Sequence, residues 1–213
     1  GKLVPFEFLG VYALALMIAE FPRQMIAQIS SVVVFPGLAR ADEQSRSELR
    51  AKFVPKQEQL LLAVAAGIAM MVVCGDWLIA ILYDNRYEEA KWLLPALSVG
   101  LWFVVLGHLH EAVLHAFGKP QIATLGNSLK FVALLIGIPL GYSLGGVHGA
   151  IVGIAISALP FYLAVEFGTR NEGMSLCRQD LRATLIFFGI LALLLAMRWS
   201  LGFGTPFDGM VER

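Results

Sequence analysis

The stretch that decides the fold spans residues 92–117 and reads WLLPALSVGLWFVVLGHLHEAVLHAF. A helix needs about 20 mostly apolar residues to cross a bilayer, and this run is long enough. Similar runs recur along the chain, separated by short charged or Gly/Pro-containing gaps. The 213 residues are 58% hydrophobic and 15% charged, with a mean hydropathy of +0.72, which is unlike an average soluble domain. Lipid is therefore the solvent that we expect for this chain.

Backbone amides and carbonyls in hydrocarbon must bond within their own segment, so each apolar run is expected to form a helix. The predicted fold is an all-α, polytopic transmembrane bundle with about six spanning helices. The predicted spans are Leu9–Leu38, Gln59–Val73, Trp92–Phe117, Ile122–Tyr142, Val147–Phe167 and Ala183–Leu201.

Some details of these spans and gaps follow from single residues. The first span is longer than a straight crossing requires, so we expect tilt or a kink at Pro22. Residues 40–56 are predicted to form a loop and a short surface helix. Residues 77–83 either extend the second span or lie at the interface, and Gly145-Gly146 separates the fourth span from the fifth.

The chain begins at Gly1 without an initiator Met, and no signal peptide is visible. We therefore expect an internal or C-terminal piece of a longer protein. Residues 1–204 are predicted to form the bundle and residues 205–213 a short polar tail. Cys74 and Cys177 are expected on opposite sides of the membrane, so no disulfide is predicted between them.

The distribution of Lys and Arg predicts the orientation. The gaps after the first, third and fifth spans hold nine of these residues, whereas the opposite side holds four. Cytoplasmic loops carry the excess of Lys and Arg, so the first set is expected to face the cytoplasm. The nine residues are Arg40, Arg46, Arg50, Lys52, Lys56, Lys119, Arg170, Arg178 and Arg182.

Glu20 and Arg23 are ionisable residues inside the first span, where each such group costs about 2.5–3.5 kcal/mol on insertion scales. Their three-residue spacing places them on one helix face, where they can pair. Two interpretations remain open. In the first, Arg23 is a counter-charge for an anionic substrate, and Glu20 pairs with it until the substrate binds. In the second, the two residues only neutralise each other at the kink.

Lys130 ends a polar stripe on the fourth span, after Gln121, Thr124 and Asn127 at three-residue steps. We expect this stripe to face the bundle interior or a water-filled cavity, where Lys130 can neutralise a phosphate. The alternative is that the long Lys130 side chain snorkels to the cytoplasmic surface.

His108, Glu111 and His115 share one face of the third span, and His110 lies just off that face. The spacing lacks the histidine pair of a zinc protease, so we favour a polar cavity wall or interfacial solvation over a metal site or proton relay.

Near the outer end of the sixth span, Arg198 is expected to snorkel to the surface.

Other function classes lack their signals. The formal net charge is zero, so no global field indicates nucleic-acid binding. The glycine-rich stretch at residues 145–153 lacks the lysine and serine of a phosphate loop. No arranged nucleophile, base and oxyanion donor is visible, so we predict no enzyme, no catalytic residue, no cofactor and no metal.

Several short motifs, in this order and spacing, indicate a known family. A span opens with Gly10-Val11-Tyr12 and closes with Phe35-Pro36-Gly37, and Gly118-Lys119-Pro120 separates two later spans. The chain resembles polysaccharide-transport proteins, the Wzx-like lipid-linked oligosaccharide flippases of the multidrug/oligosaccharidyl-lipid/polysaccharide exporter superfamily. The resemblance extends over residues 3–168. It also includes Leu82-Tyr83-Asp84, Tyr87-Glu88-Glu89-Ala90 and Gly145-Gly146-Val147-His148-Gly149-Ala150.

This resemblance implies the C-terminal bundle of a two-bundle, multi-pass transporter in the bacterial plasma (inner) membrane. A cationic cavity between the bundles would open alternately to each side. The implied substrate is an undecaprenyl-pyrophosphate-linked oligosaccharide for O-antigen (lipopolysaccharide), capsule or exopolysaccharide. The other implied partners are membrane lipids and the missing N-terminal bundle, and nucleic acid is not among them. The expected substrate-binding residues are Arg23 and Lys130, with Glu20, Asn127, His108 and Glu111 beside them.

Three alternatives stay open at this point. A multidrug or lipid II exporter would use the same scaffold, although a multidrug exporter would carry acidic residues in its cavity. An integral-membrane glycan polymerase or ligase would require a large outer loop with catalytic residues, and the outer gaps here are short. A non-transporting scaffold would leave the charge of Lys130 inside a span unexplained.

Overall fold

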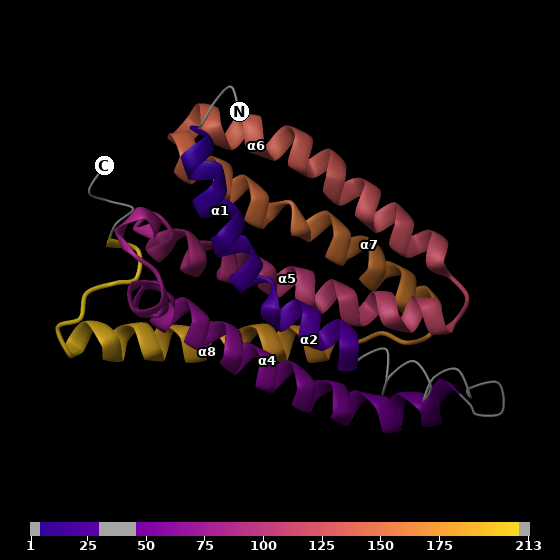
Figure 1. Ribbon diagram of the computed structural model, residues 1–213. Helices are drawn as coiled ribbons and strands as arrows, with labels where there is room; N and C mark the ends of the chain where they lie inside the picture. The colour runs from indigo at the N-terminus through magenta and orange to yellow at the C-terminus, as the bar shows by residue number, and fades with distance from the viewer. Residues whose placement is uncertain (1–4, 30–45, 209–213) are drawn as a thin grey trace.

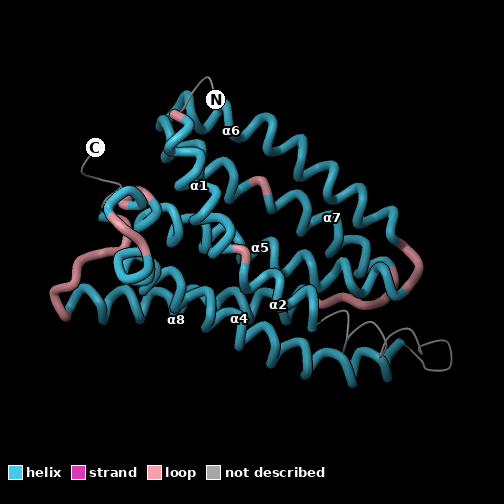
Figure 2. The backbone as a smooth tube through the Cα atoms, in the orientation of Figure 1, coloured by secondary structure: helices cyan, strands magenta, loops and turns pink. Residues whose placement is uncertain are grey.

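Every regular element in the computed structural model is helical over residues 5–29 and 46–208, the part of the chain that it describes (Figure 2). Short turns join most of these helices. The elements are α1 (Phe6–Ala19), α2 (Phe21–Ile29), α4 (Arg46–Leu82), the 3-10 turn η3 (Asn85–Tyr87), α5 (Ala90–Ala116), α6 (Pro120–Ile156), α7 (Ala158–Asn171) and α8 (Cys177–Ser200).

Four helical stretches of the described residues are long and apolar enough to cross a membrane. Their most apolar windows have mean hydropathies between 1.8 and 2.1. The prediction of an all-α transmembrane bundle is therefore confirmed. The stretches are Phe53–Leu82, Ala90–Ala116, Pro120–Asn171 and Cys177–Ser200.

Helix α5 is the centre of the bundle. It lies between α6 and α7 on one side and α4 and α8 on the other, and α1 and α2 cross it (Figure 1). Because neighbours surround it, α5 is buried on most of its faces. Trp102 stacks on Phe187 of α8 at a centroid distance of 4.6 Å, and its indole Nε1 donates to Thr184 Oγ1 at 3.0 Å. The indole is therefore packed and hydrogen-bonded at once, as a buried Trp requires.

The stretch from Pro120 to Asn171 is a helical hairpin, as the sequence predicts. Gly145 and Gly146 have non-helical dihedral angles, and Gly146 has a φ of 59°, which glycine adopts without steric cost. Beyond this turn the two arms touch through backbone atoms, because a Cβ on Gly141 would collide with the Gly149 carbonyl. The arms run antiparallel along the bundle (Figure 1), so the predicted fourth and fifth spans are both present.

The first predicted span is divided into two short helices. Helix α1 ends at Ala19 and α2 begins at Phe21, with Glu20 at the bend. The break precedes Pro22, because proline is tolerated in the first turn of a helix but not in its interior. The end of this predicted span, up to Leu38, lies outside the described residues.

Helix α4 is longer than the predicted second span. It runs from Arg46 to Leu82 and includes Pro55, so the prediction of a separate short surface helix within residues 46–56 was wrong. Residues 40–45 lie outside the described part. The helix also continues past Val73, the predicted end of this span, and through Asp76, which pairs with Arg198 of α8.

The basic gaps meet at one end of the bundle. Lys119, after α5, pairs with Glu172, after α7, at 3.7 Å. The Gln179 side-chain amide of α8 donates to the Val54 carbonyl of α4 at 3.2 Å. Within residues 46–208, this end therefore gathers the Lys and Arg residues that the sequence assigns to the cytoplasmic side, and their side of the membrane stays a prediction.

Candidate substrate groove

A cavity of about 320 Å³ lies between α1, α5 and the α6–α7 hairpin, and we call it the groove. Each helix contributes one stripe at helical spacing, so the groove follows the helix axes. Most of its lining is apolar. The lining residues are Tyr12, Leu16 and Glu20 of α1 and its C-terminal cap, Leu97, Gly100, Leu101 and Val104 of α5, and Lys130, Leu134, Ile138, Ile154, Ala155 and Ser157 of the hairpin.

Lys130 lines the groove instead of pointing into the lipid-facing surface. Its side chain is partly buried, and no carboxylate within the described residues forms an ion pair with it. The charges of Arg23, Glu20 and Glu111 act on the Lys130 ammonium, so these groups lie within electrostatic range. Lys130 is thus a cation with unused hydrogen-bond capacity in a mostly apolar cavity.

Glu20 and Arg23 are paired at the bend between α1 and α2. Arg23 donates from Nη2 to Glu20 Oε2 at 2.7 Å, and both side chains are partly exposed. The Arg23 Nε is buried and has no hydrogen-bond partner in the described structure. The guanidinium therefore keeps an unsatisfied donor after pairing.

His108, Glu111 and Asn127 form a second polar group between α5 and α6. His108 Nδ1 lies 2.6 Å from Glu111 Oε2, and the Asn127 amide lies 3.5 Å from Glu111 Oε1. Because Glu111 also acts on Lys130, this group adjoins the groove. The structure therefore brings all six predicted residues together along the interface of α1–α2, α5 and α6. That arrangement suits an anion of several oxygens, since two cations with free donors sit beside carboxylates that neutralise them when the groove is empty.

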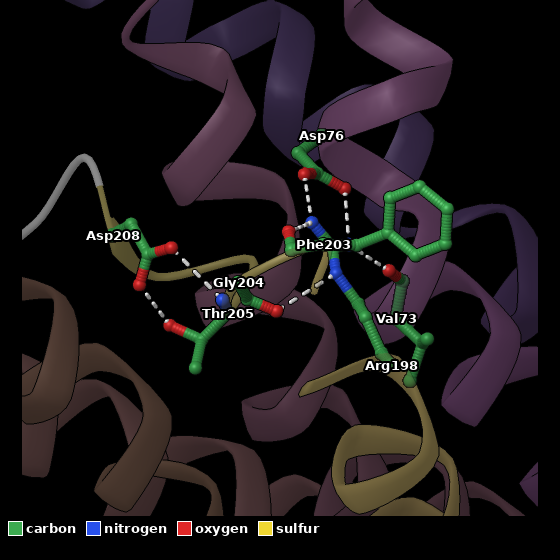
Figure 3. A network of polar contacts seen from close by, with 7 residues as sticks. All are labelled: Val73, Asp76, Arg198, Phe203, Gly204, Thr205 and Asp208. Carbon is green, nitrogen blue, oxygen red and sulfur yellow. Dashed lines mark hydrogen bonds and ion pairs between the residues drawn. The ribbon is translucent and has the colours of Figure 1, made fainter. Parts of the chain in front are cut away.

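Arg198 was predicted wrongly, and it is part of an internal network (Figure 3). Its side chain is only 4% exposed, and it donates to both carboxylate oxygens of Asp76 at 2.7 and 2.5 Å. It also donates to the Val73, Phe203 and Gly204 carbonyls and lies over the Trp77 ring at 4.7 Å. Arg198 does not snorkel, because these acceptors are available inside the protein.

The segment that follows α8 is held to this network. Thr205 donates to Asp208 from its hydroxyl at 2.5 Å and from its backbone amide at 2.9 Å (Figure 3). These two hydrogen bonds hold the pKa of the Asp208 carboxyl below its usual value. The segment thus supplies carbonyl acceptors to Arg198 and is fixed by its own turn.

Sequence reasoning also missed a buried cluster at the other end. His110, Thr169 and Asp180 come from α5, α7 and α8, and all three are buried. His110 is hydrogen-bonded to the other two residues at 2.7 and 2.6 Å. Asp180 was expected in a loop before the last span. An aspartate only three residues before the apolar run was the signal that could have indicated this cluster.

Two comparisons with known proteins bear on this chain. A family model described as "Polysaccharide biosynthesis protein" matches residues 1–92. The chain is also similar to the amylovoran biosynthesis protein AmsL of Erwinia amylovora, with 22% identity over 204 residues. This alignment covers 91% of the chain and 51% of AmsL, so the chain spans about half the length of this curated relative. No solved structure gives a significant match. The matches confirm the resemblance to polysaccharide-biosynthesis proteins.

Proposed function

We propose that the chain is part of a flippase that moves a lipid-linked oligosaccharide across the bacterial plasma membrane during exopolysaccharide or related surface-glycan synthesis. The observation that carries this proposal is the position of Lys130, a cation without an ion-pair partner among the described residues, on the wall of the groove. The membrane-spanning helices and the similarity to polysaccharide-biosynthesis proteins support it.

In this proposal the groove binds the phosphate-bearing head group of the substrate. Lys130 provides a point charge, and the partly exposed Arg23 guanidinium provides donors when phosphate oxygens replace part of its interaction with Glu20. The lipid tail stays in the bilayer, where its apolar surface is kept out of water. The protein makes and breaks no covalent bond, so it acts as a transporter and not as an enzyme.

The direct test is surface-polysaccharide export in cells whose chromosomal copy carries Lys130→Met or Arg23→Gln. We expect each variant to reduce surface glycan and to leave lipid-linked precursor in the membrane. Lys91→Met is the matched control, since Lys91 lies outside the groove beside Glu88. Normal export by both groove variants, at normal protein level, would remove these residues from the substrate site.

The proposed orientation has its own test. Cys177 is exposed at the end of the bundle that carries the basic gaps, so it should face the cytoplasm. A membrane-impermeant thiol reagent added to intact cells is expected to leave Cys177 unmodified and to label it after lysis, with Cys177→Ser as the control. Labelling in intact cells would invert the topology.

A further inference from the structure

The His110 cluster joins three helices through an unbroken set of hydrogen bonds. His110 Nδ1 lies 2.7 Å from Thr169 Oγ1, and His110 Nε2 lies 2.6 Å from Asp180 Oδ2. Tyr162 also donates its hydroxyl to Asp180 Oδ2 at 3.0 Å. The proposed transport cycle does not use any of these residues, so the cluster needs an explanation of its own.

The direction of these hydrogen bonds can be worked out from Thr169. Its hydroxyl lies 2.8 Å from the Glu166 carbonyl, which can only accept, so the single Thr169 hydroxyl proton points there. His110 Nδ1 must then be the donor to Thr169 Oγ1. The Thr169 hydroxyl therefore fixes a proton on Nδ1.

A second proton must lie on the other side of the ring. With Nδ1 protonated, a neutral imidazole has a bare Nε2, and a bare Nε2 cannot bond to a bare carboxylate at 2.6 Å. Tyr162 cannot supply this proton because it already donates its own to Asp180. We infer that His110 and Asp180 form a proton-binding site, which holds one proton more than a neutral histidine and an ionised aspartate would.

Burial favours the proton-loaded form. The side chains of His110 and Asp180 are 0% and 2% exposed, and the described residues place no Lys or Arg in an ion pair with Asp180. Tyr162, Glu166 and Cys177 are further titratable groups near the cluster, and none of the three can carry a positive charge. Without the extra proton the site would hold a buried carboxylate with no counter-charge, which is strongly unfavourable.

The released form is also defined by the geometry. If the Thr169 hydroxyl rotates from the Glu166 carbonyl to Nδ1, His110 can keep its proton on Nε2 alone and donate it to an ionised Asp180. Asp180 Oδ1 is already buried without a hydrogen-bond partner. The released form therefore leaves an uncompensated negative charge on the Asp180 carboxylate, where neither water nor a donor reaches Oδ1. Proton release therefore weakens the packing of α8 and α7 against α5 at the end of the bundle that carries the basic gaps.

The protonation state can be read directly by nitrogen NMR of the purified protein labelled with ¹⁵N-histidine in nanodiscs. The chain has four histidines, and the spectrum of His110→Gln identifies the His110 signals. We expect one proton on Nδ1 and a second proton on Nε2 or on Asp180. A ring protonated on Nε2 alone would overturn the inference.

Two variants of Thr169 test why the proton is held. Thr169→Val removes the acceptor for Nδ1, so the ring should change to the form protonated on Nε2 alone. Thr169→Ser keeps the hydroxyl and should preserve the wild-type spectrum. A Thr169→Val spectrum with Nδ1 still protonated would contradict the role given to this hydroxyl.

Discussion

Arg198 and Lys130 are both cations inside the helical bundle, but their surroundings differ. Each guanidinium nitrogen of Arg198 donates to at least one acceptor, and its charge is matched by Asp76. Lys130 has no ion-pair partner among the described residues and lines a cavity. Arg23 is intermediate, with one bond to Glu20 and an unused Nε.

The difference indicates separate roles for these charges. A cation whose donors are all satisfied by the protein has nothing left for a ligand, so Arg198 stabilises the fold. A cation with free donors in a groove is held at a cost to stability, which a bound anion can offset. The groove is therefore the region where binding is expected, and the Arg198 network is the region that keeps the helix ends together.

The largest effect is expected when the Arg198 network is broken. Arg198→Met leaves Asp76, whose side chain is 17% exposed, without its partner, which should lower the free energy of unfolding by about 3 kcal/mol. Lys130→Met removes no ion pair and should change it by less than about 1 kcal/mol. Denaturation in mixed micelles measures both values.

A double variant controls for this comparison. Asp76→Asn together with Arg198→Met removes both charges, so its loss should be smaller than the sum of the two single losses. Equal destabilisation by Arg198→Met and Lys130→Met would show that the two cations do not differ in the way their contacts suggest.

The next effect concerns the hairpin that carries Lys130. Gly141→Val places a side chain where the Gly149 carbonyl lies, so it should separate the two arms and cost about 1–3 kcal/mol. Gly189→Val is the matched control, because a Cβ at Gly189 meets open space. Substrate binding should weaken only in the first variant, since only that variant displaces the wall of the groove. Similar stability and binding in both would contradict the close packing of the arms.

The smallest effect is expected from the charge that offsets Arg23. Glu20→Gln frees the guanidinium, so affinity for a pyrophosphate-bearing lipid should rise about two- to fivefold, the equivalent of about 0.4–1 kcal/mol for a partly exposed pair. Glu88→Gln breaks a pair of the same i, i+3 spacing with Lys91, outside the groove, and should leave affinity unchanged. Weaker binding by Glu20→Gln would mean that Glu20 contacts the substrate itself.

The helical class and the hairpin could be predicted because they depend on local signals. Apolar length identifies a span, and Gly145-Gly146 marks a turn whatever surrounds it. The polar stripe before Lys130 was predicted only in part. Lys130 lines the groove, but Gln121, Thr124 and Asn127 are exposed. The position of the bend before Pro22 was close to its predicted place, since proline restricts the backbone directly.

The buried networks could not be predicted because their partners are distant in sequence. Arg198 meets Asp76 across 122 residues, and His110 meets Asp180 across 70. Each residue alone was consistent with snorkelling or with a loop. Only the packing of α4, α5 and α8 brings these partners together inside the bundle.

The most direct test of the groove is the affinity of the purified protein in nanodiscs for undecaprenyl pyrophosphate. The double variant Arg23→Gln/Lys130→Met should bind this lipid at least about tenfold more weakly than wild type, or about 1.4 kcal/mol, while Lys91→Met binds normally. Wild-type affinity in a double variant whose circular dichroism and melting temperature are also unchanged would contradict the assignment of the groove as the head-group site.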